Sequence, residues 1–195
     1  LSAYNISEKE LYDLVDAGEW TLDRLLEITS DISQADSDGK WTEGAFYGVS
    51  CVDGNMLDSF YITSGQKLFE IEEGHLTTSK DITSAKTVGL YEKVYKAIYD
   101  DHIISYGANA GVTNYMFKNN KSVFGVMTVY NLKGIVDDAK DVGLLPFPKY
   151  IEDERYRTLL GSPHTQYFIP FDANKVDESA AVMETMAYAS NLFVT

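Results

Sequence analysis

The stretch SVFGVMTVY, which runs from Ser122 to Tyr130, decides the fold class that the sequence predicts. It is a nearly continuous apolar run of strand length, a pattern typical of a strand whose sheet is covered by helices on both faces. A second run, FYGVSCV at residues 46–52, is rich in aromatic and β-branched residues and predicts another strand. Together the two runs indicate a sheet with helices packed on it.

Helical patterns lie on both sides of these runs in the sequence. Ser7 and Glu10 form a capping box in front of a helix that Gly18 ends, and Thr21 is the predicted cap of a second helix. Trp20 lies between the two helices and has the size to lock them together. Further helices are predicted at 56–64, 82–98, 114–119, 132–139 and 176–190, a hairpin at 67–77, and brief strands at 142–145 and 166–169.

Strands that alternate with helices indicate an α/β fold with a mixed sheet flanked by helices. The sequence has no internal repeat, no low-complexity tract and no linker rich in Pro, Gly and Ser. We therefore expect residues 1–195 to form a single domain. No apolar run approaches the roughly 18 residues that a membrane span needs, and residues 1–5 lack the pattern of a signal peptide.

The charge of the chain narrows the classes of partner. The 16 Lys and Arg against 30 Asp and Glu give a formal charge of -14 at pH 7. Such a surface repels phosphate backbones and anionic lipid, so binding to nucleic acid is not expected. With 45% hydrophobic residues the chain has enough apolar material for a core. The single cysteine, Cys51, has no intrachain partner and is expected to be buried.

Catalytic motifs are weak in this sequence. None of the three histidines has the i, i+4 spacing of a zinc helix, and there is no Gly-x-Ser-x-Gly elbow or phosphate-binding glycine loop. We predict no catalytic residue, metal ligand or cofactor. Asp36 and Asp38 resemble part of a calcium loop, but the ligand positions at Gln34 and Ala45 fail, which favours a plain surface turn. A glycosidase pair of carboxylates stays open, because such a pair is defined by separation in space.

The best candidates for ligand binding lie where the apolar run at 122–130 ends and a helix begins. Thr128, Tyr130 and Asn131 lie at the end of this run, and strand ends are where open α/β sheets present groups to a ligand. Their hydroxyls, amide and aromatic ring suit a sugar, although Tyr residues commonly just fill half-buried positions. His164 lies in a polar loop at 161–167, where it either points into a cleft or caps a neighbouring carbonyl group.

Several stretches, in a fixed order, resemble the extracellular solute-binding proteins of ABC importers, of the maltose-binding or family 1 type. Most of the chain is covered by these similarities. The family's first-lobe strands and its C-terminal helices have no counterpart in the sequence, so the resemblance implies the second lobe alone. The similar stretches are 11–23 with Gly18-Glu19-Trp20-Thr21, 36–48, 117–124, 141–149 with Gly143-Leu144-Leu145-Pro146-Phe147-Pro148-Lys149, and 167–170 followed by a helix with Ala180, Ala181 and Met186.

The resemblance implies one lobe of a type II periplasmic-binding-protein fold that closes with a second lobe on a solute. The solute would be a sugar or oligosaccharide, passed without catalysis to an ABC permease. The implied ligand-binding residues are Thr128, Tyr130 and Asn131, His164, and Tyr61, since the family often places an aromatic residue near that helix; Tyr130 stands where many relatives have Trp. The family is extracellular or at the cell surface, and lipid anchoring would use an N-terminal part upstream of residue 1.

Two other functions remain open from the residues themselves. One is a carbohydrate-active enzyme that uses two of the many carboxylates as a catalytic pair. The other is an acidic protein-interaction domain in which any cleft is incidental.

Overall fold

A computed structural model describes residues 6–52, 55–107, 110–136, 142–152, 154–159 and 167–194. The contacts within the chain separate it into two compact units, Leu1–Leu159 and Leu160–Thr195. Each unit is described by itself. The prediction of a single domain stays a prediction.

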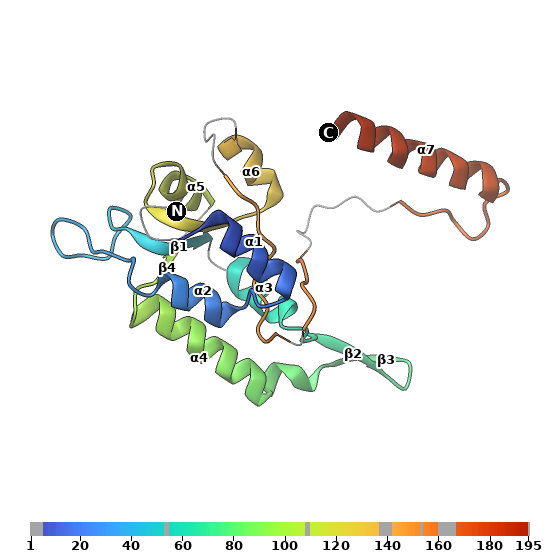
Figure 1. The fold of residues 1–195 in the computed structure, drawn as a ribbon. Helices are drawn as coiled ribbons and strands as arrows, with labels where there is room; N and C mark the ends of the chain where they lie inside the picture. The colour runs from blue at the N-terminus through green and yellow to red at the C-terminus, as the bar shows by residue number, and fades with distance from the viewer. Residues whose placement is uncertain are drawn as a thin grey trace. The chain divides into compact units, whose positions relative to one another are not determined.

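A three-stranded parallel sheet lies at the centre of the first unit (Figure 1). It consists of β1 (Tyr47–Val52), β4 (Ile104–Gly107) and β5 (Ser122–Val126), in the order β4-β1-β5. Val49 of the central strand is aligned with Ile104 on one side and with Phe124 on the other. The predicted strand at 46–52 is confirmed, whereas the prediction of a mixed sheet is wrong, because all pairs in this sheet are parallel.

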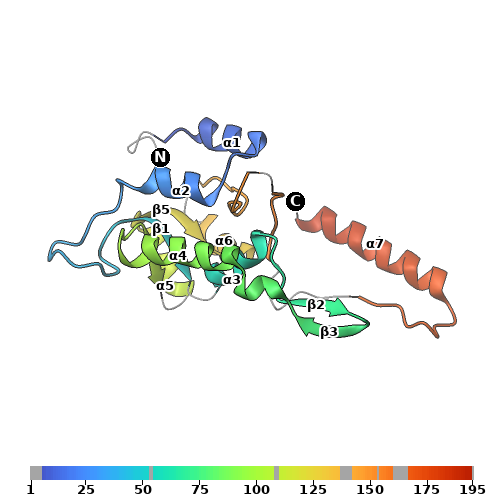
Figure 2. The ribbon, with the colours of Figure 1, turned by 90° about the horizontal axis from the view of Figure 1, so that it is seen from below.

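Helices flank the sheet, as the sequence predicts. Figure 2 shows the strands between α2 on one side and α5 on the other. Helix α5 contacts all three strands, α2 and α3 contact β1, and α4 contacts β4. The helices of this unit are α1 (Glu8–Ala17), α2 (Leu22–Thr29), α3 (Asn55–Thr63), α4 (Ala85–Tyr99), α5 (Ala110–Lys118) and α6 (Val129–Val136), with a 3₁₀ turn, η2 (Lys80–Thr83), before α4.

The predicted signals at the ends of the first two helices are confirmed. The Ser7 side chain accepts a hydrogen bond from the backbone of Glu10, whose carboxylate in turn accepts one from the Ser7 N–H. Gly18 ends α1 in the left-handed region, at φ 77°, and Thr21 caps α2 through the N–H of Arg24. These caps satisfy backbone donors that would otherwise lack a partner at the helix start.

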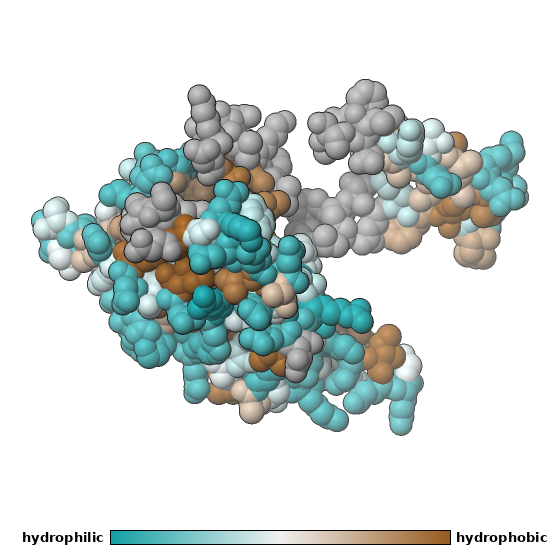
Figure 3. Space-filling model, viewed as in Figure 1, coloured by the Kyte–Doolittle hydropathy of each residue, from teal (hydrophilic) through white to brown (hydrophobic). Residues whose placement is uncertain are grey.

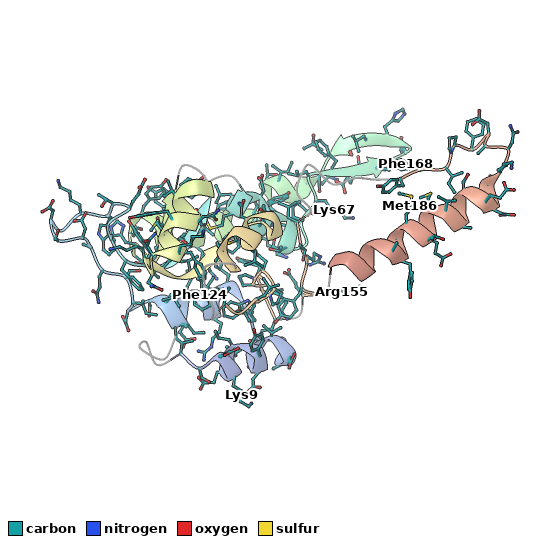
Figure 4. The ribbon with its side chains drawn as sticks, turned by 90° about the horizontal axis from the view of Figure 1, so that it is seen from above. Lys9, Lys67, Phe124, Arg155, Phe168 and Met186 are labelled. Carbon is teal, nitrogen blue, oxygen red and sulfur yellow. The ribbon has the colours of Figure 1, made fainter. Side chains whose placement is uncertain are left out.

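Trp20 joins the helical layer to the sheet. Its indole is 2% exposed, its Nε1–H donates to the carbonyl of Pro146 over 2.9 Å, and its ring centroid lies 5.8 Å from that of Phe124. Figure 4 shows Phe124 among the side chains between the sheet and the first two helices, and Lys9 on the outside of α1. The core residues around Trp20 include Leu11, Leu22, Leu25, Val49, Cys51, Met56, Phe60, Leu90, Val94 and Ile104.

The apolar run at 122–130 divides between two elements. Its first part forms β5, but Val129 and Tyr130 belong to α6, so the prediction that the strand reaches Tyr130 is wrong. The reason is a turn at Thr128, whose Oγ1 and carbonyl oxygen accept from the N–H of Asn131 over 3.4 Å and 3.0 Å. A hydroxyl in this position starts a helix, although the surrounding residues are apolar.

Two brief predicted strands do not form. Residues 142–145 belong to no described sheet. The backbone pairing of this segment occurs farther along, at Lys149, which forms an isolated bridge with Thr21 between α1 and α2. The N–H of Lys149 donates to Trp20, and its carbonyl accepts from Leu22 over 2.7 Å. Residues 167–169 are not in a strand either, and Gln166 lies outside the described residues.

The predicted hairpin at 67–77 is confirmed as an element separate from the parallel sheet. Its strands are β2 (Phe69–Glu72) and β3 (His75–Thr78), which pair antiparallel. Glu73 and Gly74 form the turn, both with positive φ, at 52° and 83°. Two successive residues of this kind are typical of the tight turns that match the twist of a hairpin.

The second unit contains α7 (Val176–Val194), which confirms the helix predicted at 176–190. An ion pair between Lys175 and Glu178, at 3.6 Å, supports its first turn. Across the described part of the chain, no helix combines the length and the hydrophobicity needed to cross a membrane.

Candidate functional site: the carboxyl edge of the parallel sheet

Each strand of the parallel sheet leads directly into a helix: β1 into α3, β4 into α5, and β5 into α6. Because the strands are parallel, the three helices begin at the same edge of the sheet. The chain passes from the central strand to β4 on one side and then to β5 on the other. Such a reversal of strand order is where open α/β sheets have their ligand crevice.

Two of the predicted ligand-binding residues lie together at this edge. Thr128 is exposed at the start of α6, and Asn131 is half-buried one turn later. The bond from the Asn131 N–H uses one acceptor position of the Thr128 hydroxyl, which keeps its own proton to donate. Tyr130 lies between them on α6; its side chain is outside the described part of the structure, as is the whole of His164.

Tyr61 has a structural place instead. Its side chain lies in the core, with 4% of the residue exposed, and its hydroxyl donates to the carbonyl of Lys67 over 2.9 Å. Burial, with a smaller contribution from the carboxylate of Asp81, raises the pKa of the Tyr61 phenol. Its hydroxyl therefore links α3 to the base of the hairpin, and its ring offers no surface to a solute.

Thr113 is a residue at this edge that the sequence did not indicate. It lies in the first part of α5, only 1% exposed, and its Oγ1 has no hydrogen-bond partner. The side-chain oxygen of Asn114, next to it, is also buried without a partner. Buried polar atoms are nearly always paired, so the Thr113 hydroxyl and the Asn114 side-chain oxygen are exceptions among the described residues.

The sequence did not indicate Thr113 because its position depends on two elements that the sequence patterns did not predict correctly. Strand β4 was not predicted at all, and α5 begins four residues before the predicted start at Asn114. The sequence did offer one signal for Thr113: it lies four residues before Phe117, the spacing of two residues on one face of a helix. The Phe117 ring lies 3.0 Å from where a Cβ on Gly125 would be, which shows that this stripe of α5 packs on β5.

Asp36 has its carboxylate fully engaged in its own loop. Oδ1 accepts from the N–H of Asp38 and Lys40, over 3.0 Å and 2.8 Å, and Oδ2 accepts from the Thr42 hydroxyl over 2.6 Å. The Thr42 bond, followed by the Lys40 bond, lowers the pKa of Asp36. The geometry is that of a turn closed by an Asp side chain, as the sequence favours.

Other surface features of the first unit lie away from this edge. A shallow hollow of about 480 Å³ lies at α1 and α2, and Figure 3 shows apolar residues gathered between these helices. Its lining includes Ile6, Leu14 and Ile28 together with Glu10 and Glu19. Within the described ranges there is no cluster of three or more His, Cys, Asp or Glu residues that could hold a metal ion.

Comparisons of the chain with protein-family models, with curated proteins and with solved structures found no match.

Proposed function

We propose that this chain is one lobe of a two-lobed solute-binding protein that captures a sugar or oligosaccharide for an ABC importer and does not catalyse a reaction. The parallel sheet flanked by helices supports the proposal, because it is compatible with a lobe of the type II periplasmic-binding-protein fold. The order of the resembling stretches supports it as well. An extracellular or lipid-anchored location and contact with a membrane permease belong to the same proposal.

The observation that carries the proposal is the set of neutral polar groups at the carboxyl edge. Thr128 and Asn131 lie at the start of α6, which packs against α5, and both residues have exposed surface. Hydroxyl and amide groups that can both donate and accept suit a sugar, whose rim is a series of hydroxyls. The charge of -14 also favours a neutral solute over an anionic one.

The proposed mechanism is closure of two lobes on the solute. One lobe supplies part of the hydrogen bonds, and the second lobe covers the solute and supplies the rest. The closed state is stabilised only by the differential affinity of the solute for it. We therefore expect this chain alone to bind the solute weakly.

Titration of the ¹⁵N-labelled chain with maltose, maltotriose and cello-oligosaccharides, followed by NMR, tests the proposal. We expect saturable shifts at residues 110–114 and 127–131, with dissociation constants of about 1 mM or weaker. Asn131→Ala should weaken binding by about tenfold, the effect of losing a hydrogen-bond group at a binding site. Asn119→Ala is the matched control, because Asn119 is exposed just after the other end of α5 and its amide donates to the Tyr115 carbonyl of the same helix.

Two outcomes would contradict the proposal. Shifts confined to the hollow at α1 and α2 would place the site elsewhere. Appearance of cleaved oligosaccharide, abolished by one Asp or Glu substitution, would instead establish the carbohydrate-active enzyme.

A further inference from the structure

The hairpin formed by β2 and β3 exposes more apolar surface than its size explains. Phe69 is 58% exposed, Ile71 75% and Leu76 71%. Figure 1 shows the hairpin reaching away from the parallel sheet, and Figure 3 shows apolar residues among hydrophilic ones at its far end. Large apolar side chains gathered on a protruding element are typical of a surface that binds a partner.

These apolar side chains share one face of the hairpin. Phe69 and Ile71 are two residues apart on β2, so they point to the same side. Leu76 is directly opposite Ile71 in the register of the two strands. A two-stranded hairpin is at best marginally stable alone in water, and a third strand that extends the apolar face would stabilise it.

Strand β2 has a free edge and a regular alternation of side chains. Among the strands that the structure describes, β3 is the only one paired with β2. The strand reads Phe69-Glu70-Ile71-Glu72, apolar on one face and acidic on the other. Strand β3, which contains Thr77 and Thr78, lacks this alternation. The edge of β2 can therefore discriminate more strongly among partner sequences than the edge of β3 can.

The charges around the hairpin are unbalanced. From residue 67 to residue 81 there are two lysines, Lys67 and Lys80, and four carboxylates. The only ion pair described within this segment joins Lys80 to Glu72, at 3.8 Å, with the Lys80 side chain 92% exposed. A hollow beside the turn is lined by Glu72, Glu73, His75 and Thr77. The polar face of the hairpin therefore favours cationic groups.

We propose that the edge of β2 binds an extended segment of a partner protein in which apolar residues alternate with Lys or Arg. Backbone hydrogen bonds would join the segment to β2 as a third strand. Its apolar side chains would then lie beside Phe69 and Ile71, and its cationic side chains beside Glu70 and Glu72, as cross-strand neighbours. This site does not depend on the proposed solute-binding function.

A second copy of this chain does not fit this edge. It would bring Glu70 and Glu72 against the same two carboxylates, and two chains of charge -14 repel each other. The alternation of acid and apolar residues in β2 is complementary to a basic strand and not to itself.

The probe for this site is a fluorescein-labelled peptide of about eight residues that alternates Val and Lys, long enough for one strand. Its comparison is the same peptide with Glu in place of Lys. Fluorescence anisotropy with the full chain should show saturable binding of the Val/Lys peptide, with affinity at least about tenfold above that of the Val/Glu peptide. Amide exchange should slow at Phe69 and Ile71, because their N–H groups face the free edge of β2 and would gain strand partners.

A charge-swap variant separates this site from general attraction to an acidic protein. The double substitution Glu70→Lys and Glu72→Lys should reverse the preference, so that the Val/Glu peptide binds better. The control, Glu8→Lys with Asp16→Lys, makes the same change of net charge on α1 and should keep the original preference. Amide exchange at Thr77 and Ser79, whose N–H groups face β2, verifies in the free variants that the hairpin is intact.

The apolar face is tested with Phe69→Thr and Ile71→Thr, because threonine removes apolar surface but still favours a strand. We expect this variant to lose at least about tenfold in affinity for the Val/Lys peptide. Equal binding of both peptides, or an unchanged preference in the charge-swap variant, would overturn the proposal. A concentration-dependent dimer in sedimentation, lost in the Thr variant, would overturn it too and assign the edge to a second copy.

Discussion

Asp36 shows how one side chain can order a whole loop at the residue scale. Its two oxygens accept three hydrogen bonds from residues within six positions along the chain. The carbonyl of the same residue accepts from the N–H of Gly39, which closes the turn. A carboxylate whose oxygens already accept these hydrogen bonds is a poor ligand for a cation. This explains physically why the segment forms a surface turn and not a calcium-binding loop.

The pH dependence of this loop follows from the direction of the Asp36 pKa. The folded pKa is lowered, so the carboxylate contributes fully above the unfolded pKa of about 3.9 and its contribution is lost as pH falls through the lower folded value. Thr42→Val removes the largest cause and should raise the Asp36 pKa. ¹³C NMR titration of the Asp36 carboxyl measures this shift. Thr77→Val, a Thr in the hairpin, should leave the titration unchanged, and an unchanged Asp36 pKa in Thr42→Val would contradict the assignment.

At the scale of elements, close packing of β1 on α2 depends on a glycine. A Cβ on Gly48 would lie 2.4 Å from the Cβ of Thr29, which is fully buried and bonds to the Leu25 carbonyl over 2.7 Å. Neither backbone nor side chain can move easily there. Gly48 thus lets the helix approach the strand.

We expect Gly48→Ala to destabilise the chain by about 1–3 kcal/mol, because overpacking forces the strand and the helix apart. Gly134→Ala is the matched control, because Gly134 is exposed on α6 and no described atom outside its own helix backbone lies within 4 Å of the added Cβ. There the substitution should stabilise by about 0.5–1 kcal/mol, since alanine favours a helix. Urea unfolding measures both. Equal effects at the two positions would show that the contact between Gly48 and Thr29 does not limit the packing.

The elements also show which parts of the fold can be predicted from the sequence. Helices α1 and α2 have their start and stop signals in local residues, Ser7, Gly18 and Thr21, and both are found. Strand β4 has four residues, Ile104-Ser105-Tyr106-Gly107, and is held by its neighbour β1 more than by any pattern of its own. Its absence from the prediction reflects tertiary pairing that overrides local propensity.

The same limit applies to the candidate site. Thr128 and Asn131 could be placed near the carboxyl edge because they lie at the end of an apolar run, but the apolar residues of that run hid the start of α6. Thr113 depends on β4 and the true start of α5, and so it could not be placed. Tyr61 was chosen through the resemblance alone, and its burial depends on packing that the sequence does not show.

At the scale of the whole first unit, residues 142–152 and 154–159 join elements that are far apart in the sequence. Lys149 bonds to the link between α1 and α2, and Tyr156 donates to the Val15 carbonyl over 3.2 Å. Farther along, the carboxylate of Glu154 pairs with Lys86 of α4, and Arg157 donates to the carbonyl of Thr63 at the end of α3. Cations at the end of a helix suit its partial negative charge. This segment therefore connects the first two helices with α3 and α4, although its described residues form no strand.

The many carboxylates of the chain repel one another across the whole molecule. Because a charge of -14 disfavours the compact state, added salt should stabilise the fold by screening it. Salt also weakens exposed ion pairs such as Lys9–Asp13, but pairs so open to solvent contribute little to stability. We expect the melting temperature to rise as NaCl increases to about 0.3 M, where the screening length is several ångströms.

A variant with less charge provides the control for this effect. Asp31→Lys with Glu43→Lys changes exposed positions and brings the charge from -14 to -10, since each substitution adds two. If self-repulsion dominates, the variant should melt higher at low salt and gain less from NaCl. A melting temperature that falls with added salt would mean that the ion pairs outweigh the repulsion. In that case attraction within ion pairs would contribute more to the stability of the fold than repulsion among the carboxylates removes.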